Sequence, residues 1–151
     1  MTKRFFLVFF LLSLNLAAQD SASISKWNVS VSNPDAKAGD EVELVFLATI
    51  DKNWKLYSSD FKNDIGPLPT EFKFSAADSY KLVGDITPVN PKKTVDPTWD
   101  VAYTYFAEKA EFRQKIKVSR KDFVAKGTIK GLLCSNVDGV CIPFQESFQV
   151  Y

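Results

Sequence analysis

The chain has 151 residues, 46% of them hydrophobic and 14% aromatic, which is enough for one packed domain and not for two. Its 19 basic and 18 acidic side chains give a net charge of +1, and this balance argues against a nucleic-acid partner or an anionic membrane surface. Histidine is absent, which excludes serine-histidine-aspartate and cysteine-histidine nucleophiles and every histidine-based metal site.

Residues 1–18 have the pattern of a signal peptide. Lys3 and Arg4 precede an apolar run, and the small residues Ala17 and Ala18 follow it where cleavage is expected. The apolar run is shorter than the roughly 20 residues that a membrane-spanning helix needs. We therefore expect export, with an uncleaved anchor as the alternative.

Export places the mature chain in an oxidising compartment, where a pair of cysteines persists as a disulfide. The expected location is the periplasm, with secretion as the alternative. Residues 19–26 are expected to be a short linker, and residues 27–151 one domain.

The first predicted strands follow the linker. Trp27, Val29 and Val31 alternate with polar residues, which predicts a strand with one buried face. Residues 42–50 are apolar on both faces after their first charged position, as in a central strand covered on two sides. A turn follows, so residues 42–50 and 54–57 are expected to form a hairpin.

The middle of the chain is rich in proline. Residues 58–70 are expected to be an irregular crossover. Short strands are predicted around residues 72–74 and 80–83. Residues 85–98 hold three prolines and predict a long ordered loop or a segment that follows a sheet edge.

Alternation resumes in the last third of the chain. Residues 101–106 are strand-like; after them Phe112 and Ile116 fall on one face of a strand, and Arg113 and Lys115 on the other. With about eight to ten short strands and no sustained helical period, the expected fold is an all-β, immunoglobulin-like antiparallel β-sandwich. A closed barrel is the alternative.

The two cysteines, Cys134 and Cys141, lie on a predicted hairpin whose turn spans residues 135–139. Antiparallel neighbours bring such side chains within bonding reach, so a disulfide is compatible with this hairpin. Two cysteines cannot complete a tetrahedral zinc site without carboxylates or a partner chain. We therefore expect no metal and no cofactor.

The chain after its leader resembles the periplasmic N-terminal domain of the DsbD-type thiol:disulfide interchange reductases, which also occurs as a free-standing disulfide bond corrector domain. The pieces that carry the resemblance are Trp54-Lys55-Leu56-Tyr57, Gly66-Pro67-Leu68-Pro69-Thr70, Phe72-Lys73-Phe74, Leu82-Val83-Gly84-Asp85, residues 112–118, residues 126–131 and the hairpin ending in Cys141-Ile142-Pro143.

The sequence departs from the family pattern at two places. Pro143 is followed by Phe144 where the family usually has a second proline, and six residues separate the cysteines, slightly more than in the best-known members. The full-length reductases also continue into a membrane domain and a thioredoxin-like domain. The resemblance therefore implies a component of a protein-disulfide reductase that lacks both of these domains.

The resemblance also implies roles for particular residues. Cys141, the cysteine before proline, would exchange with partners, and Cys134 would be the resolving thiol. An aromatic cap would shield the pair, with Trp99 as the first candidate and Tyr103 as the second; packing in the interior is the alternative for both. Tyr57 would form a wall of the site.

Asp100 is the remaining candidate, as a carboxylate that would raise the pKa of a nearby thiol. The expected partners are thioredoxin-like domain proteins, a separate DsbD-like membrane reductase to which the domain would be an auxiliary, and exported client proteins.

A second function remains open from the residues alone. A disulfide that closes so short a loop contributes about 2.5 kcal/mol in the chain-entropy model and is common in secreted sandwiches. The chain would then be a secreted immunoglobulin-like binding module that presents Trp99, Tyr103 and Tyr105 to a glycan or protein, with the disulfide as a structural staple.

Overall fold

The computed structural model describes residues 21–151, so the predicted signal peptide lies outside the described residues. The described elements are the short helix α1 (Ser21–Ile24) and the strands β1 (Ser25–Val31), β2 (Glu41–Ile50), β3 (Trp54–Tyr57), β4 (Glu71–Phe74), β5 (Tyr80–Pro88), β6 (Lys92–Asp96), β7 (Val101–Ala107), β8 (Lys109–Val118), β9 (Ala125–Ser135) and β10 (Cys141–Val150). Within this part of the chain, no helix has the length and hydropathy needed to cross a membrane.

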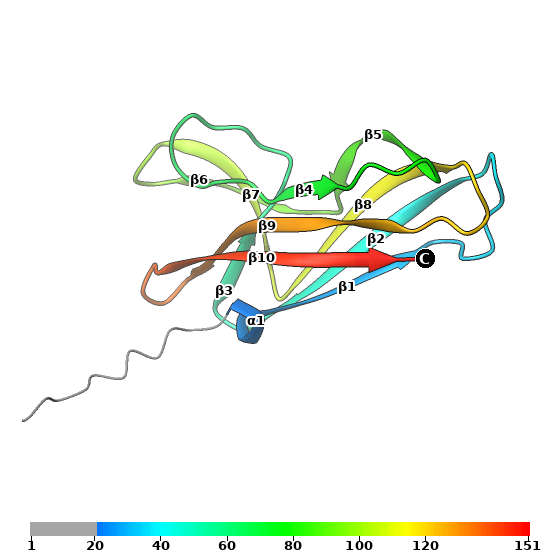
Figure 1. Ribbon diagram of the computed structural model, residues 1–151. Coiled ribbons are helices and arrows are strands. Elements are labelled where there is room, and N and C mark those ends of the chain that lie inside the picture. The colour runs from blue at the N-terminus through cyan, green and yellow to red at the C-terminus, as the bar shows by residue number, and fades with distance from the viewer. Residues whose placement is uncertain (1–20) are drawn as a thin grey trace, which may run out of the picture.

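The strands form two antiparallel sheets, as predicted. A four-stranded sheet has the order β1-β2-β8-β5, and a six-stranded sheet has the order β10-β9-β3-β7-β6, with β4 paired to β9. In Figure 1, β9 and β10 pass in front of β2 and β8, and the tip of the β9–β10 hairpin lies at the same end as β6 and β7. The all-β sandwich prediction is confirmed.

Phenylalanine rings fill the space between the sheets. Phe46 and Phe112 from the four-stranded sheet are fully buried. Their ring centroids lie 5.0 and 4.9 Å from that of Phe72, which comes from β4 of the opposite sheet. Such offset and edge contacts between aromatic rings add to the stabilisation from burying apolar surface. We call the apolar residues between the sheets the inner core.

The prediction for β2 and β3 was wrong in two respects. The outward residues of β2 are not covered, and Leu47 keeps 43% of its surface exposed, because the four-stranded sheet has no further layer on that side. The expected hairpin is also absent: β2 pairs with β1 and β8, whereas β3 pairs with β7 and β9. The turn at residues 51–53 therefore carries the chain from one sheet to the other.

The proline-rich segment 85–98 contains more strand than predicted. β5 continues to Pro88 through an irregularity between Val83 and Thr87, and β6 begins at Lys92. Both β5 and β6 are edge strands of their sheets. An edge strand tolerates proline because one of its sides needs no ladder hydrogen bond. The expectation of a segment that follows a sheet edge is confirmed, and that of a long loop is wrong.

The connection from β3 to β4 is irregular, as predicted, and hydrogen bonds join its beginning to its end. The Thr70 amide donates to the Ser58 carbonyl at 3.0 Å, and the Thr70 hydroxyl donates to the Tyr57 carbonyl at 2.5 Å. Residues 58–70 therefore leave the sheet and return at almost the same point. Phe61, within this excursion, packs against Tyr57 and Tyr103 of the six-stranded sheet.

Candidate functional site: the Cys134–Cys141 disulfide and its cleft

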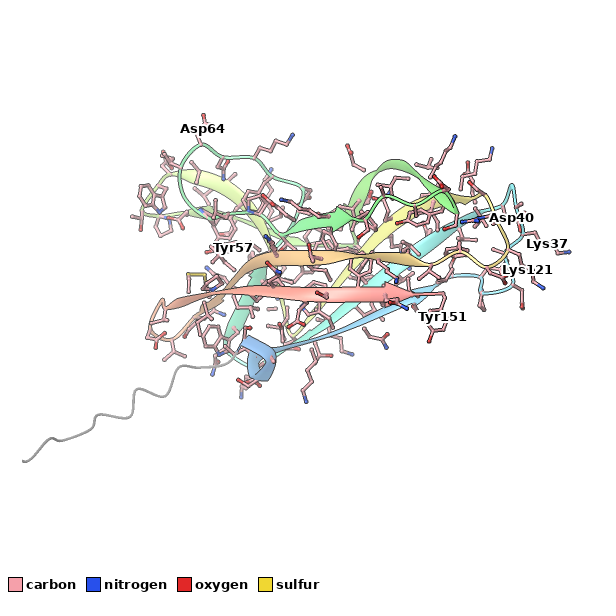
Figure 2. All side chains as sticks on the ribbon, viewed as in Figure 1. Lys37, Asp40, Tyr57, Asp64, Lys121 and Tyr151 are labelled. Atoms are coloured by element: carbon pink, nitrogen blue, oxygen red, sulfur yellow. A yellow bond between two sulfur atoms is a disulfide. The ribbon has the colours of Figure 1, made fainter. Side chains whose placement is uncertain are left out.

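The two cysteines form a disulfide across the β9–β10 hairpin. They are directly paired in the antiparallel ladder, with an S–S distance of 2.03 Å and a Cα–Cα distance of 4.1 Å. This Cα spacing is close to the short one that alternates along antiparallel pairs. In Figure 2 the disulfide, the yellow bond between two sulfurs, lies at the turn end of this hairpin, near Tyr57.

The hairpin turn is ordered by its own side chains. The Ser135 hydroxyl accepts hydrogen bonds from the amides of Val137 and Asp138, and the Asp138 carboxylate accepts one from the Val140 amide. Hydrogen bonds of the Asp138 carboxylate with the Ser135 side chain and with the Val140 amide lower the pKa of Asp138. Gly139 has a φ of +76°, a conformation that glycine adopts without steric cost.

The disulfide lies on the outer face of the six-stranded sheet, because side chains alternate along a strand. On β9, Leu133 points into the inner core, so Cys134 points the other way. On β3, Leu56 points inward, and Lys55 and Tyr57 point outward. Lys55 is the direct ladder partner of Cys134.

The two sulfurs differ in their access to solvent. Cys134 is only 2% exposed and packs in a cluster with Tyr57, Phe61 and Tyr103, whereas Cys141 is exposed. We call the group formed by Cys134, Tyr57, Phe61 and Tyr103 the outer cluster. Loop residues cover it, since the excursion 58–70 contributes Phe61. A partner approaching from solvent therefore meets Cys141 before Cys134.

Lys55 brings a positive charge to the outer cluster. Its Nζ donates a hydrogen bond to the Tyr103 hydroxyl at 3.0 Å, and it lies 5.4 and 5.3 Å from the ring centroids of Tyr57 and Tyr103. Burial lowers the pKa of Lys55, but the hydrogen bond with Tyr103 and the attraction to the two tyrosines in their ionised form outweigh it, so the pKa is raised. The Lys55 ammonium is therefore charged at neutral pH.

A cleft of about 470 Å³ opens beside the disulfide and is lined by both cysteines, Lys55, Tyr57, Tyr103 and Trp99, among others. Trp99 is held there by a turn: the Asp96 carboxylate accepts hydrogen bonds from the amides of Thr98 and Trp99 at 2.9 and 3.1 Å. Half of the Trp99 surface remains exposed.

Gly66 of the excursion lies across from this turn. Its φ is +94°, and a Cβ atom there would stand 3.1 Å from Val101 and 3.5 Å from the Trp99 ring. A close approach of the excursion to the Trp99 ring therefore depends on glycine at this position.

The structure brings most of the predicted site residues together. Cys134, Cys141, Trp99, Tyr103 and Tyr57 all line the cleft. Asp100 does not; it is exposed, with a φ of +53°, and its amide donates to the Asp96 carbonyl.

Two charged residues of the cleft lining were not predicted. Asp96, and not Asp100, supplies the carboxylate; the Asp-Pro pair at the start of its turn was the available signal. Lys55 supplies the cation, and its spacing of two from Tyr57 was the signal that both share a face. Tyr103 is 5% exposed, so it is not available for the binding surface of the alternative function.

Comparison with known proteins identifies the family. Residues 26–151 match the family model described as thiol:disulfide interchange protein DsbD, N-terminal. No curated protein sequence matches the chain. Among solved structures, the reduced DsbD N-terminal domain of Neisseria meningitidis superposes with a TM-score of 0.56 at 17% identity, covering 87% of each chain.

Two further structures share the fold. The N-terminal periplasmic domain of ScsB from Proteus mirabilis has a TM-score of 0.55 at 15% identity, over 87% of this chain and 48% of that one. A chain from the complex between the DsbD and PilB N-terminal domains of Neisseria meningitidis has a TM-score of 0.51 at 13% identity. The match covers 89% of this chain and 88% of that one. The chain, a two-sheet sandwich with a cysteine pair on its final hairpin, belongs to the DsbD N-terminal domain family.

Proposed function

We propose that this protein is an exported thiol–disulfide exchange domain. It would pass reducing equivalents between a thioredoxin-like donor and exported client proteins through the Cys134–Cys141 pair. The observation that carries the proposal is the asymmetry of the disulfide, with Cys141 exposed and Cys134 buried in the outer cluster. Exchange needs one reachable sulfur and a second one that closes the bond again.

The reaction begins when a thiolate of the reduced donor attacks the Cys141 sulfur. A bond forms between the donor and Cys141, the Cys134–Cys141 bond breaks, and Cys134 leaves as a thiolate. The second thiol of the donor then displaces Cys141. The donor ends as a disulfide, and its two electrons and two protons end on the two cysteines of the domain.

The same residues act in the opposite sense toward a client. The Cys141 thiolate attacks a client disulfide to form a mixed disulfide, and Cys134 attacks the Cys141 sulfur and releases the client as a dithiol. Since Cys134 is the ladder partner of Cys141, the resolving sulfur is already next to the bond that it must break. This proximity favours resolution over escape of the mixed disulfide.

The cleft supports a shielding role for Trp99. Its ring lines the same cleft as Cys141 and remains half exposed, so it would hinder the approach of a small thiol, and a protein partner would displace it. Tyr57 and Tyr103 would form the walls of the site beneath it. We assign no electrostatic role to Asp100, which lies outside the cleft lining.

The family and the solved relatives support the choice of partner and compartment. One relative is a periplasmic domain, and another was solved in complex with the PilB N-terminal domain. We therefore propose the periplasm as the location, and a thioredoxin-like domain and a DsbD-like membrane reductase as the redox partners.

A pair of single-cysteine variants tests the proposal. Cys134→Ser leaves the exposed Cys141 free; its thiolate should attack the disulfide of an oxidised thioredoxin-like protein, displace one cysteine of that protein as a thiolate and hold the other as a mixed disulfide that a reductant releases. Cys141→Ser is the matched control, since its remaining thiol is buried, and it should trap far less. Equal trapping by both variants, or by neither, would contradict the proposed function.

Equilibration of the native protein with glutathione buffers gives an independent measurement. A potential well below about −300 mV would identify a structural disulfide. That result would favour the alternative, a binding module in which the disulfide is only a staple.

A further inference from the structure

Lys55 is the ladder neighbour of the cysteine that would leave as a thiolate during exchange. It is the direct cross-strand partner of Cys134, on the outer face of the same sheet. Directly opposite residues in an antiparallel pair have their Cβ atoms about 4.5–5.5 Å apart. Both side chains line the same cleft.

The buried position of Cys134 is unfavourable for a thiolate. With 2% of its surface exposed, among the rings of Tyr57, Phe61 and Tyr103, its sulfur has little access to water. Burial in apolar surroundings raises a thiol pKa, and a nearby cation lowers it. An exchange site with a buried leaving sulfur therefore needs a positive group close to it.

The charged and titratable groups of the cleft come from five strands. β3 contributes Lys55 and Tyr57, β6 contributes Asp96, β7 contributes Tyr103, and β9 and β10 contribute the cysteines. Lys55 is the basic side chain among these lining residues. The Asp96 carboxylate is occupied by two backbone amides, and Asp138, in the hairpin turn, is exposed and outside the lining.

The Lys55 ammonium is held in place without a carboxylate partner. It donates to the Tyr103 hydroxyl and lies near two aromatic rings, while the ion pairs found among residues 21–151 join Arg113 to Glu43 and Glu111. A neutral phenol leaves most of the lysine's charge uncompensated. The charge is therefore available to an anion that forms nearby.

We propose that Lys55 stabilises the thiolate that Cys134 becomes when a partner thiolate attacks Cys141. The inference rests on the proposed function and names a positioning residue of the same site. In that step the partner–Cys141 bond forms, the Cys134–Cys141 bond breaks, and its electron pair stays on Cys134, beside the Lys55 ammonium. A leaving thiol of lower pKa leaves faster, so Lys55 speeds the opening of the disulfide.

The first test is a thiol titration that needs no partner. In a Cys141→Ser background, the ultraviolet absorbance of the thiolate reports the ionisation of Cys134, with and without Lys55→Met. Methionine keeps the apolar stem and removes the charge. We expect the Cys134 thiolate fraction at a fixed pH to fall about tenfold, the lower end of the effect of a close opposite charge.

Three further variants control the titration. Lys55→Arg retains the charge and should titrate like the parent. Lys126→Met removes an exposed lysine at the far end of β9 and should also leave the titration unchanged. Lys55→Gln replaces Lys55→Met as the neutral variant if circular dichroism shows that Lys55→Met does not fold. Identical titration of the parent and the neutral variants, or an equal shift in Lys126→Met, would overturn the inference.

The second test separates this inference from the proposed function. The disulfide form of Lys55→Met should be reduced by a thioredoxin-like dithiol about threefold more slowly than the parent protein, and Lys55→Arg at the parental rate. A parent protein inert to every such donor defeats the proposed function, while the titration still decides the role of Lys55. Normal exchange with an unchanged titration defeats the role of Lys55 alone.

Discussion

The two faces of the six-stranded sheet are built from the same strands but carry different kinds of side chain. On β3, β7 and β9 the inward residues Leu56, Phe106 and Leu133 belong to the inner core. Their outward neighbours include Tyr57, Tyr103 and Cys134, which form the outer cluster with Phe61. Alternation along each strand therefore separates a packed apolar interior from the disulfide by the thickness of one sheet.

The faces also differ in what covers them. A second sheet covers the inner face, whereas the excursion 58–70 and the turn after β6 cover the outer one. The Lys55 ammonium contacts the outer cluster through the Tyr103 hydroxyl, whereas no lysine belongs to the inner core. We infer that stability resides mainly in the inner core and redox chemistry in the outer cluster, and that mutations can change one without the other.

The largest loss of stability is expected on the inner face. Phe112→Ala removes a fully buried ring that touches Trp27, Phe72 and Phe106, and it should cost about 3–5 kcal/mol of unfolding free energy in urea. The rate at which a dithiol reduces the native disulfide should stay at the wild-type value. A marked change in that rate would show that the two faces are coupled.

Removal of the disulfide should have a smaller effect. The double variant Cys134→Ser/Cys141→Ser loses a short covalent loop, worth about 2.5 kcal/mol in the chain-entropy model. Its sheets should remain folded by circular dichroism, because neither cysteine belongs to the inner core. The reduced wild-type protein is the matched control. Global unfolding of both forms at room temperature would contradict the separation of the two faces.

Loss of one hydroxyl in the outer cluster should lower the free energy of unfolding by less than loss of the disulfide does. Tyr103→Phe keeps the ring but removes the acceptor of the Lys55 hydrogen bond, at a cost of about 1 kcal/mol. A double-mutant cycle with Lys55→Met should show that the two effects are not additive. Additive effects would mean that Tyr103 does not hold the ammonium in place.

Trp99→Ala should change stability by no more than about 0.5 kcal/mol, since its side chain is half exposed. Reduction of the disulfide by a small thiol should nevertheless become faster if Trp99 shields the pair, because the variant removes a ring from the cleft lining. Val95→Ala, an exposed apolar change on the neighbouring strand β6 and outside the cleft lining, is the control. Equal rates in both variants would show that Trp99 does not shield the pair.

The smallest effect on stability is expected from alkaline pH. Burial raises the pKa of Tyr57, and that of Lys55 is also raised, from ordinary values of 10.0 and 10.5. A group whose pKa is raised on folding stabilises the fold below its ordinary pKa and loses this contribution as the pH rises through the folded value. The melting temperature should therefore fall above about pH 10, and less steeply in Lys55→Met, where the charged group is absent.

Much of the fold could be predicted from the sequence because its signals are local. Alternation at Trp27, Val29 and Val31 and the turn residues of the cysteine hairpin each concern neighbours along the chain, and each agrees with the structure. The family resemblance is also confirmed. The errors at β2, β3 and the segment 85–98 concern which strand pairs with which, and pairing joins residues that are far apart in the sequence.

The sequence by itself therefore determined the sandwich and the cysteine hairpin. Only the tertiary structure decided that Lys55 lies opposite Cys134, that Asp96 rather than Asp100 lines the cleft, and that Cys134 is the buried sulfur. The physical reason is that a side-chain period is set by the backbone of one strand. The register between strands, and the loops that cover a face of the sheet, depend on the packing of segments that meet only after the chain has folded.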